Sequence, residues 1–207
     1  MEYYHELVTQ KSWIELQKLK EKLDFVLIGG WATYLYTKTI KSKDIDILID
    51  FDKLPIIEKS YQIVKNDRLK KYEALKGEVQ IDIYLPHYSE IGIPVEDLMK
   101  KTFNLEGFTV LESNYLLALK IYTLQQRGRT PKGRKDFIDI IAIVESDIIN
   151  WDIVISVIKE YGLSSVGDNL KDFLAENYEL LELDINKHKY SQLKRNLLNK
   201  LSYNTST

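Results

Sequence analysis

The chain of 207 residues contains no cysteine and only three histidines. The absence of cysteine excludes disulfides, cysteine-ligated zinc, iron–sulfur clusters and thiol nucleophiles. His5, His87 and His188 are far apart in the sequence, which argues against zinc sites and Ser-His-Asp triads. The charges nearly balance, with 29 Lys plus Arg against 31 Asp plus Glu and a net charge of -2, so a uniformly basic nucleic-acid binder is excluded. The composition leaves carboxylate-based chemistry, or a function in binding alone.

Long apolar runs are also missing. The apolar runs are short, such as Phe25 to Ile28 and Ile138 to Val144, and the latter is broken by Asp139. None approaches the roughly 20 residues of a membrane span. The first residues carry glutamates and lack the apolar core of a signal peptide. We therefore expect a cytoplasmic protein with no membrane partner.

The first half of the chain alternates between helical and strand patterns. Residues 6–23 place apolar side chains at helical spacing, and residues 24–28 form a short β-branched run that ends at Gly29-Gly30. Residues 42–50, with strict alternation of polar and apolar side chains from Asp44 to Ile47, and residues 78–85, which alternate again, predict two strands with one polar face each.

The segments around these strands give weaker signals. Residues 56–66 have the spacing of a helix, residues 68–75 fit neither pattern, and residues 101–111 indicate a small hairpin. From Ser113 onward the pattern is helical. Helices are expected at residues 115–126, 136–145, 151–161, 167–178 and 190–201.

The change of pattern near Leu111 predicts two domains. Residues 1–111 would form a mixed β-sheet lobe with flanking helices, and residues 112–207 an all-helical lobe. The expected fold class is therefore α+β.

Three aspartates in the predicted strands indicate metal chemistry. Residues two apart on a strand share a face, so Asp44 and Asp46 project side by side. Adjacent carboxylates repel each other unless a cation lies between them, and hard oxygen ligands suit Mg²⁺ or Mn²⁺. Asp82 has the same setting in the second strand, and three converging carboxylates would suit a two-metal site for phosphoryl transfer.

The alternative is that these acidic residues only lie on the solvated face of a sheet. Aspartate is disfavoured in strands, which weakens this interpretation for Asp44 and Asp46. Asp50 and Asp52 continue the alternation near the strand end, and for them solvated loop carboxylates are the preferred interpretation.

The Gly29-Gly30 pair joins the first short strand to a predicted helix. Glycines at such a junction expose backbone N–H groups and the positive end of the helix dipole, where phosphates bind readily. An ordinary turn can also contain two glycines. The pair indicates a phosphate site mainly because it precedes the strand with Asp44 and Asp46.

Together these segments resemble the signature of the DNA polymerase β-like nucleotidyltransferase superfamily. That signature is a hydrophobic-Gly-Gly/Ser turn, here Ile28 to Gly30, then a strand with Asp-x-Asp, here Asp44 to Asp46, and a later carboxylate, here Asp82. The resemblance covers residues 24–86. It implies the transfer of a nucleoside monophosphate from an NTP.

The resemblance also implies roles for single residues. Asp44 and Asp46 would hold magnesium and the triphosphate. Asp82 would complete the set of metal-site carboxylates, and would position and deprotonate the attacking hydroxyl. Gly29 and Gly30 would contact the phosphates.

A lysine within an apolar stretch marks the first helix of the second half. Lys120 follows the run Leu116 to Leu119, and must either reach solvent along its stem or meet an anion. A basic loop then follows, made of Arg127, Arg129, Lys132, Arg134 and Lys135. The loop favours a polyanionic acceptor, and a solvated run of charges is its alternative.

This half resembles the AbiEii/MenT-type nucleotidyltransferase toxins, in which a helical Leu-x-x-Lys segment precedes a basic turn and a Lys-Asp-x-x-Asp helix. Lys120, Lys135-Asp136 and Asp139 match that order. The resemblance implies that Lys120 holds triphosphate oxygens and that Asp136 is a further active-site carboxylate, with helix N-capping as the alternative for Asp136. We also predict nucleotide contacts for Lys43, Arg127 and Lys135.

The sequence thus predicts a magnesium-dependent nucleotidyltransferase, with Asp44, Asp46, Asp82, Lys120 and Asp136 as its catalytic residues. The expected partners are an NTP, an RNA acceptor such as the tRNA 3′ end and, by the toxin resemblance, an antitoxin protein. Two alternatives stay open: an antibiotic-type enzyme with a small hydroxylated acceptor, and a non-catalytic nucleotide- or RNA-binding module. For the basic segment 187–200, a solvated helix face is preferred over a nucleic-acid contact.

Overall fold

The computed structural model describes residues 2–163 and 168–202 of the chain. The chain divides into two compact units, Met1–Glu112 and Ser113–Thr207. The first unit holds a mixed sheet with helices, and the described part of the second unit is built from helices. This confirms the predicted α+β fold class with a helical C-terminal part. That each unit is a domain with its own role stays a prediction.

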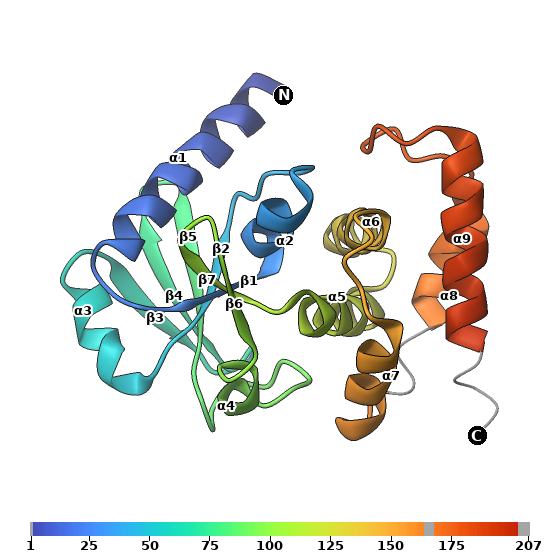
Figure 1. Cartoon of the computed structure of the whole chain (residues 1–207). Coiled ribbons are helices and arrows are strands. Elements are labelled where there is room, and N and C mark those ends of the chain that lie inside the picture. The colour runs from blue at the N-terminus through green and yellow to red at the C-terminus, as the bar shows by residue number, and fades with distance from the viewer. Residues whose placement is uncertain (1, 164–167, 203–207) are drawn as a thin grey trace. The chain divides into compact units, whose positions relative to one another are not determined.

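The strands of the first unit form one seven-stranded sheet in the order β3-β4-β5-β2-β1-β7-β6 (Figure 1). The strands are β1 (Val26–Ile28), β2 (Ile45–Leu48), β3 (Gln62–Asn66), β4 (Lys71–Lys76), β5 (Val79–Tyr84), β6 (Thr102–Leu105) and β7 (Phe108–Leu111). The helices are α1 (Glu2–Lys20), α2 (Gly29–Thr37), α3 (Leu54–Glu58), α4 (Val95–Leu98) and the 3₁₀ turn η1 (Phe51–Lys53). The pairs β2–β5 and β1–β7 are parallel and the others antiparallel, so the sheet is mixed.

The alternating pattern of β2 and β5 separates an apolar face from a polar one. Ile45 and Ile47 on β2, and Ile81 and Ile83 on β5, are fully buried in the core. The aspartates between these isoleucines therefore point to the opposite face. Helix α1 packs on β5, and α2 packs on β1 and β2 (Figure 1).

The structure of residues 56–66 differs from the predicted helix. A helix was expected there, but α3 ends at Glu58 and residues Gln62–Asn66 form strand β3. The β-branched Ile63 and Val64 suit a strand, and pairing with β4 supplies hydrogen bonds that no sequence pattern within the segment reveals. The ambiguous segment 68–75 contains most of β4, while the expected hairpin at 101–111 is confirmed as β6 and β7.

The second unit contains the helices α5 (Ser113–Arg127), α6 (Pro131–Glu145), α7 (Trp151–Glu160), α8 (Asp168–Glu176) and α9 (Lys187–Ser202). Helix α6 begins five residues before its predicted start at Asp136, because Thr130 caps it and Pro131 fits its first position. Gly167, the predicted start of α8, lies outside the described residues. In the described parts of the chain, no helix combines the length and the apolar character that crossing a membrane requires.

Candidate active site

Two of the three predicted carboxylates lie side by side in the middle of the sheet. Strands β2 and β5 run parallel and place Asp46 opposite Asp82. Neighbouring strands are about 4.8 Å apart, and paired residues point to the same face. Asp44 lies in the bend just before β2, two positions before Asp46, and is half-buried like it. The sequence prediction of adjacent carboxylates on two strands is therefore met for Asp46 and Asp82.

The glycine turn lies against one of these carboxylates. Gly29 adopts a left-handed φ of +66°, and a Cβ atom built on it would be 2.2 Å from Oδ2 of Asp46. Only glycine combines this backbone angle with this close approach. No local sequence pattern reveals this contact, because Gly29 and Asp46 are 17 positions apart along the chain and meet through the pairing of β1 with β2.

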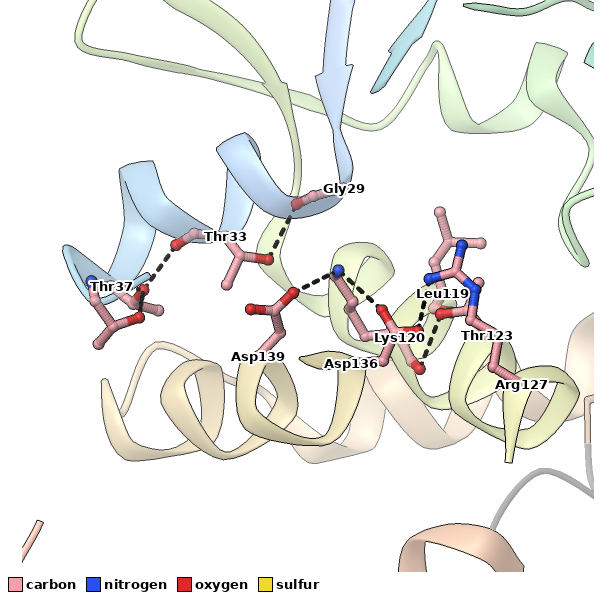
Figure 2. Close-up of polar contacts among 10 residues, drawn as sticks. Gly29, Thr33, Thr37, Leu119, Lys120, Thr123, Arg127, Asp136 and Asp139 are labelled. Atoms are coloured by element: carbon pink, nitrogen blue, oxygen red, sulfur yellow. Dashed lines mark hydrogen bonds and ion pairs between the residues drawn. The ribbon is translucent and has the colours of Figure 1, made fainter. Parts of the chain in front are cut away.

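Helix α2 starts at Gly29 with features that suit an anion. Residue Ile28 at its N-cap makes no side-chain hydrogen bond, and no acidic residue lies in its first turn. The free end of a helix attracts negative charge through its N–H groups and its dipole. Thr33 donates back to the carbonyl of Gly29 at 3.1 Å, which ties down the first turn (Figure 2). Phosphate contacts from Gly29 and Gly30 stay a prediction that fits this arrangement.

The carboxylate of Asp82 is held by two protein donors. Nζ of Lys71 donates to Oδ2 at 2.5 Å, and Nε2 of Gln80 donates to Oδ1 at 2.7 Å. Burial alone would lower the pKa of Lys71, but its hydrogen bonds and charge interactions with Asp82 and Glu73 outweigh that effect and raise it. Sequence reasoning missed Lys71, since it lies in the segment that fitted neither pattern.

The donor set fits a divalent cation at Asp44 and Asp46. Their carboxylate oxygens are the hard ligands that Mg²⁺ and Mn²⁺ prefer. Over residues 2–163 and 168–202, no three His, Asp or Glu side chains are arranged to hold one metal together. Asp82 already has an ammonium group as its partner, so its predicted role as a third metal ligand stays a prediction.

The second unit contains a buried network of charges around Lys120. Nζ of Lys120 lies 2.6 Å from Oδ2 of Asp139 and 3.2 Å from Oδ1 of Asp136 (Figure 2). Arg127 donates from Nη1 to the other oxygen of Asp136 at 2.7 Å. Lys120 is 7% exposed, and Asp136 and Asp139 are 2% and 1% exposed. The network therefore fixes α5 to α6 with charge-assisted hydrogen bonds.

This network decides between two sets of alternatives. Lys120 does not reach solvent along its stem, because its ammonium group ends between two buried carboxylates. Asp136 is not a helix N-cap, because α6 begins at Pro131 and Thr130 supplies the capping oxygen. Sequence reasoning found Lys120 and Asp136 but assigned no role to Asp139, which makes the shorter contact to Lys120. Nucleotide contacts of Lys120 stay a prediction.

The basic loop makes ion pairs within its own unit. Three of its arginines pair with carboxylates: Arg127 with Asp136, Arg129 with Glu176, and Arg134 with Glu182. These side chains are 41%, 64% and 33% exposed, so the interpretation of the loop as a solvated run of charges is not contradicted. Lys135 and, in the first unit, Lys43 are half-buried, and their predicted nucleotide contacts stay predictions.

Comparisons with known proteins bear on the fold. No family model matches the chain, and no curated protein matches it by sequence. Among solved structures, a protein from H. pylori assigned as a nucleotidyltransferase is 17% identical with a TM-score of 0.50, and the match covers 95% of this chain and 96% of that one.

The antibiotic-resistance factor ANT(2'')-Ia is similar as well. Its solution structure is 13% identical with a TM-score of 0.54, and the match covers 86% of this chain and all (100%) of that one. Its crystal structure in complex with adenylyl-2''-tobramycin is 14% identical with a TM-score of 0.53, over 77% of this chain and 98% of that one. At these identities the likeness concerns the fold. The chain therefore shares the fold of these nucleotidyltransferase structures.

Proposed function

We propose that this protein transfers a nucleoside monophosphate from an NTP to an acceptor hydroxyl, with Mg²⁺ or Mn²⁺ as cofactor. The observation that carries the proposal is the pairing of Asp46 with Asp82 on parallel strands, with Asp46 against the Gly29 turn, in a nucleotidyltransferase fold. Aspartates on the polar face of a central sheet next to an open helix end suit a triphosphate and its cation.

In the proposed reaction, the acceptor oxygen forms a bond to the α-phosphorus of the NTP. The bond from that phosphorus to the bridging oxygen breaks, and pyrophosphate leaves. Asp44 and Asp46 hold the cation, which neutralises charge on the phosphates when it is bound. Asp82 orients the acceptor hydroxyl and accepts its proton.

The remaining roles come from the resemblance to the AbiEii/MenT-type toxins. Lys120 contacts triphosphate oxygens, and Asp136 supports Lys120 and Arg127 through the observed hydrogen bonds. Independently of that resemblance, we propose nucleotide contacts for Lys43, Arg127 and Lys135. In this proposal the protein is a toxin with an antitoxin as its partner.

The acceptor we propose is RNA, with the tRNA 3′ end as the first candidate. The basic loop no longer supports this choice, since three of its arginines are paired within the chain. The proposal for RNA therefore depends on the toxin resemblance. A small hydroxylated acceptor is the alternative that an experiment has to separate from it.

The test uses each NTP labelled at the α-phosphate, Mg²⁺, and either total tRNA or tobramycin as acceptor. We expect label on tRNA with the unmodified protein and loss of that label with Asp46→Asn. We expect retention with Asp50→Asn, which changes an exposed carboxylate between β2 and η1. Label on tobramycin alone would support the small-molecule alternative. NTP binding without any transfer would support the non-catalytic alternative and overturn the proposal.

A further inference from the structure

A chain of polar side chains crosses three strands beside the candidate site. Asn66 on β3 donates to Glu73 at 3.0 Å, and Lys71 on β4 lies 3.0 Å from Glu73 and 2.5 Å from Asp82. Gln80 on β5 donates to the remaining oxygen of Asp82. The strand register places these side chains on the face of the sheet that carries Asp46, because Asp82 is paired with Asp46 on one side and with Glu73 on the other.

Lys71 is the only cationic member of this chain of side chains. It is 7% exposed, and Asp82 is 7% exposed as well. Removing an ammonium group from water is costly unless carboxylates surround it, and here two of them do. A lysine at an exposed position of the same sheet would carry no such cost, so its buried position calls for an explanation.

The ammonium group lies where a cation bound to Asp82 would lie. It contacts Oδ2 of Asp82 directly, and Gln80 already donates to Oδ1. A divalent cation on Oδ2 would have to displace Lys71 or bind beside its positive charge. The ion at Asp44 and Asp46 meets no such obstacle from Lys71, since the described contacts of Lys71 go to Asp82 and Glu73.

We propose that Lys71 is a positioning residue that supplies the positive charge at Asp82, so that the site binds one divalent cation at Asp44 and Asp46 instead of two. Lys71 and Gln80 together fix the direction of the Asp82 carboxylate toward the acceptor hydroxyl. The role in orienting the acceptor rests on the proposed function, whereas the number of bound ions does not.

The test counts bound Mn²⁺ by electron paramagnetic resonance, for the protein alone and with the α,β-methylene analogues of the four NTPs. We expect one protein-bound ion for the unmodified chain and for Lys65→Met, which removes an exposed lysine of the same sheet paired with Asp67. We expect one additional ion for Lys71→Met, because Asp82 and Glu73 then lack their cation. Two ions in the unmodified chain, or equal counts in the unmodified chain and Lys71→Met, would overturn the proposal.

Asp82→Asn gives a second test if Lys71→Met fails to fold. Since Asp82 is not a metal ligand in this proposal, its neutral variant keeps the count at one. A loss of Mn²⁺ binding in Asp82→Asn would contradict the proposal.

The kinetic test separates positioning from a structural role. We expect Lys71→Met to lower kcat by at least about 10-fold with little change in the KM for NTP, and Lys71→Arg to restore part of that loss. An unchanged kcat in Lys71→Met would overturn the positioning role. If the unmodified chain transfers no nucleotide, the proposed function fails, but the ion count still decides the proposal about Lys71.

Discussion

At the scale of single residues, the contact between Gly29 and Asp46 is the tightest constraint on the candidate site. Gly29→Ala would place a Cβ atom 2.2 Å from the Asp46 carboxylate at a backbone angle that only glycine adopts readily. Since Asp46 must then move, we expect nucleotidyl transfer to fall by at least about 100-fold. The measurement is the initial rate of label transfer from NTP.

Gly77 provides a matched control for this substitution. It has a similar left-handed φ of +60°, but an added Cβ atom would meet nothing within 4 Å. Gly77→Ala therefore imposes the same kind of backbone strain without a collision. Equal losses of activity in the two variants would show that strain, and not displacement of Asp46, is responsible.

Lys120 shows how a candidate catalytic residue is also a structural one. Replacing it with methionine leaves Asp139 buried without its cation, while Asp136 keeps Arg127. We expect this to cost about 3–5 kcal/mol in the free energy of unfolding. Urea denaturation measures this loss. Lys132→Met, on the exposed part of the basic loop, should change stability by less than about 0.5 kcal/mol. A stable Lys120→Met protein would mean that the network contributes little to folding.

Site residues could be predicted from the sequence where strand alternation or a motif marks them. Asp46 and Asp82 were found because each alternates with buried isoleucines. Lys71 and Asp139 received no role, since their partners come from other strands or helices and no local pattern records such a contact. A single sequence does not reveal contacts between residues that lie far apart along the chain.

At the scale of elements, secondary structure was predicted correctly where one face of a segment is buried. It was predicted wrongly where hydrogen bonds to a neighbouring strand determine the structure of the segment. The alternation predicts strands β2 and β5. The spacing of residues 56–66 instead predicts a helix and does not reveal β3, whose strand state depends on hydrogen bonds with β4. The start of α6 was also placed too late. Thr130-Pro131 is a typical helix start, and the basic residues that follow it hid that signal.

The cap of α6 can be tested on its own. The Thr130 side chain accepts a hydrogen bond from the backbone N–H of Gly133 at 3.1 Å. Thr130→Ala removes that acceptor and should lower the free energy of unfolding by about 1 kcal/mol, whereas Thr130→Ser keeps the hydroxyl and should lose little. Chemical denaturation of the two variants measures the difference. Equal stabilities would argue that water replaces the cap without cost.

At the scale of the whole molecule, the net charge of -2 hides many specific pairs. The arginines of the basic loop are matched by carboxylates of α6, α8 and the segment after α8. In the first unit, the carboxylate of Glu15 on α1 accepts hydrogen bonds from Lys76 of β4 and from the hydroxyl of Tyr61. The totals of acidic and basic residues show none of these pairs, which depend on the fold.

The Glu15 cluster makes stability depend on pH. Burial alone would raise the pKa of Glu15, but hydrogen bonds from Lys76 and Tyr61 and the charges of Lys76 and Lys18 lower it below its usual value of 4.5. A carboxylate with a lowered pKa stabilises the folded state above its unfolded-state pKa, and this contribution is lost as the pH falls through the folded-state pKa.

Replacing Glu15 with glutamine tests this linkage. We expect Glu15→Gln to unfold more easily than the unmodified chain by about 1–3 kcal/mol at neutral pH, because Lys76 and Tyr61 lose a charged acceptor. Well below the lowered pKa the two proteins should become equally stable, since Glu15 is then protonated. Glu78→Gln, which removes an exposed partner of Lys11, should show almost no difference at either pH. A gap between Glu15→Gln and the unmodified chain that stays constant as the pH falls would show that packing of this side chain, and not its charge, holds α1 to the sheet.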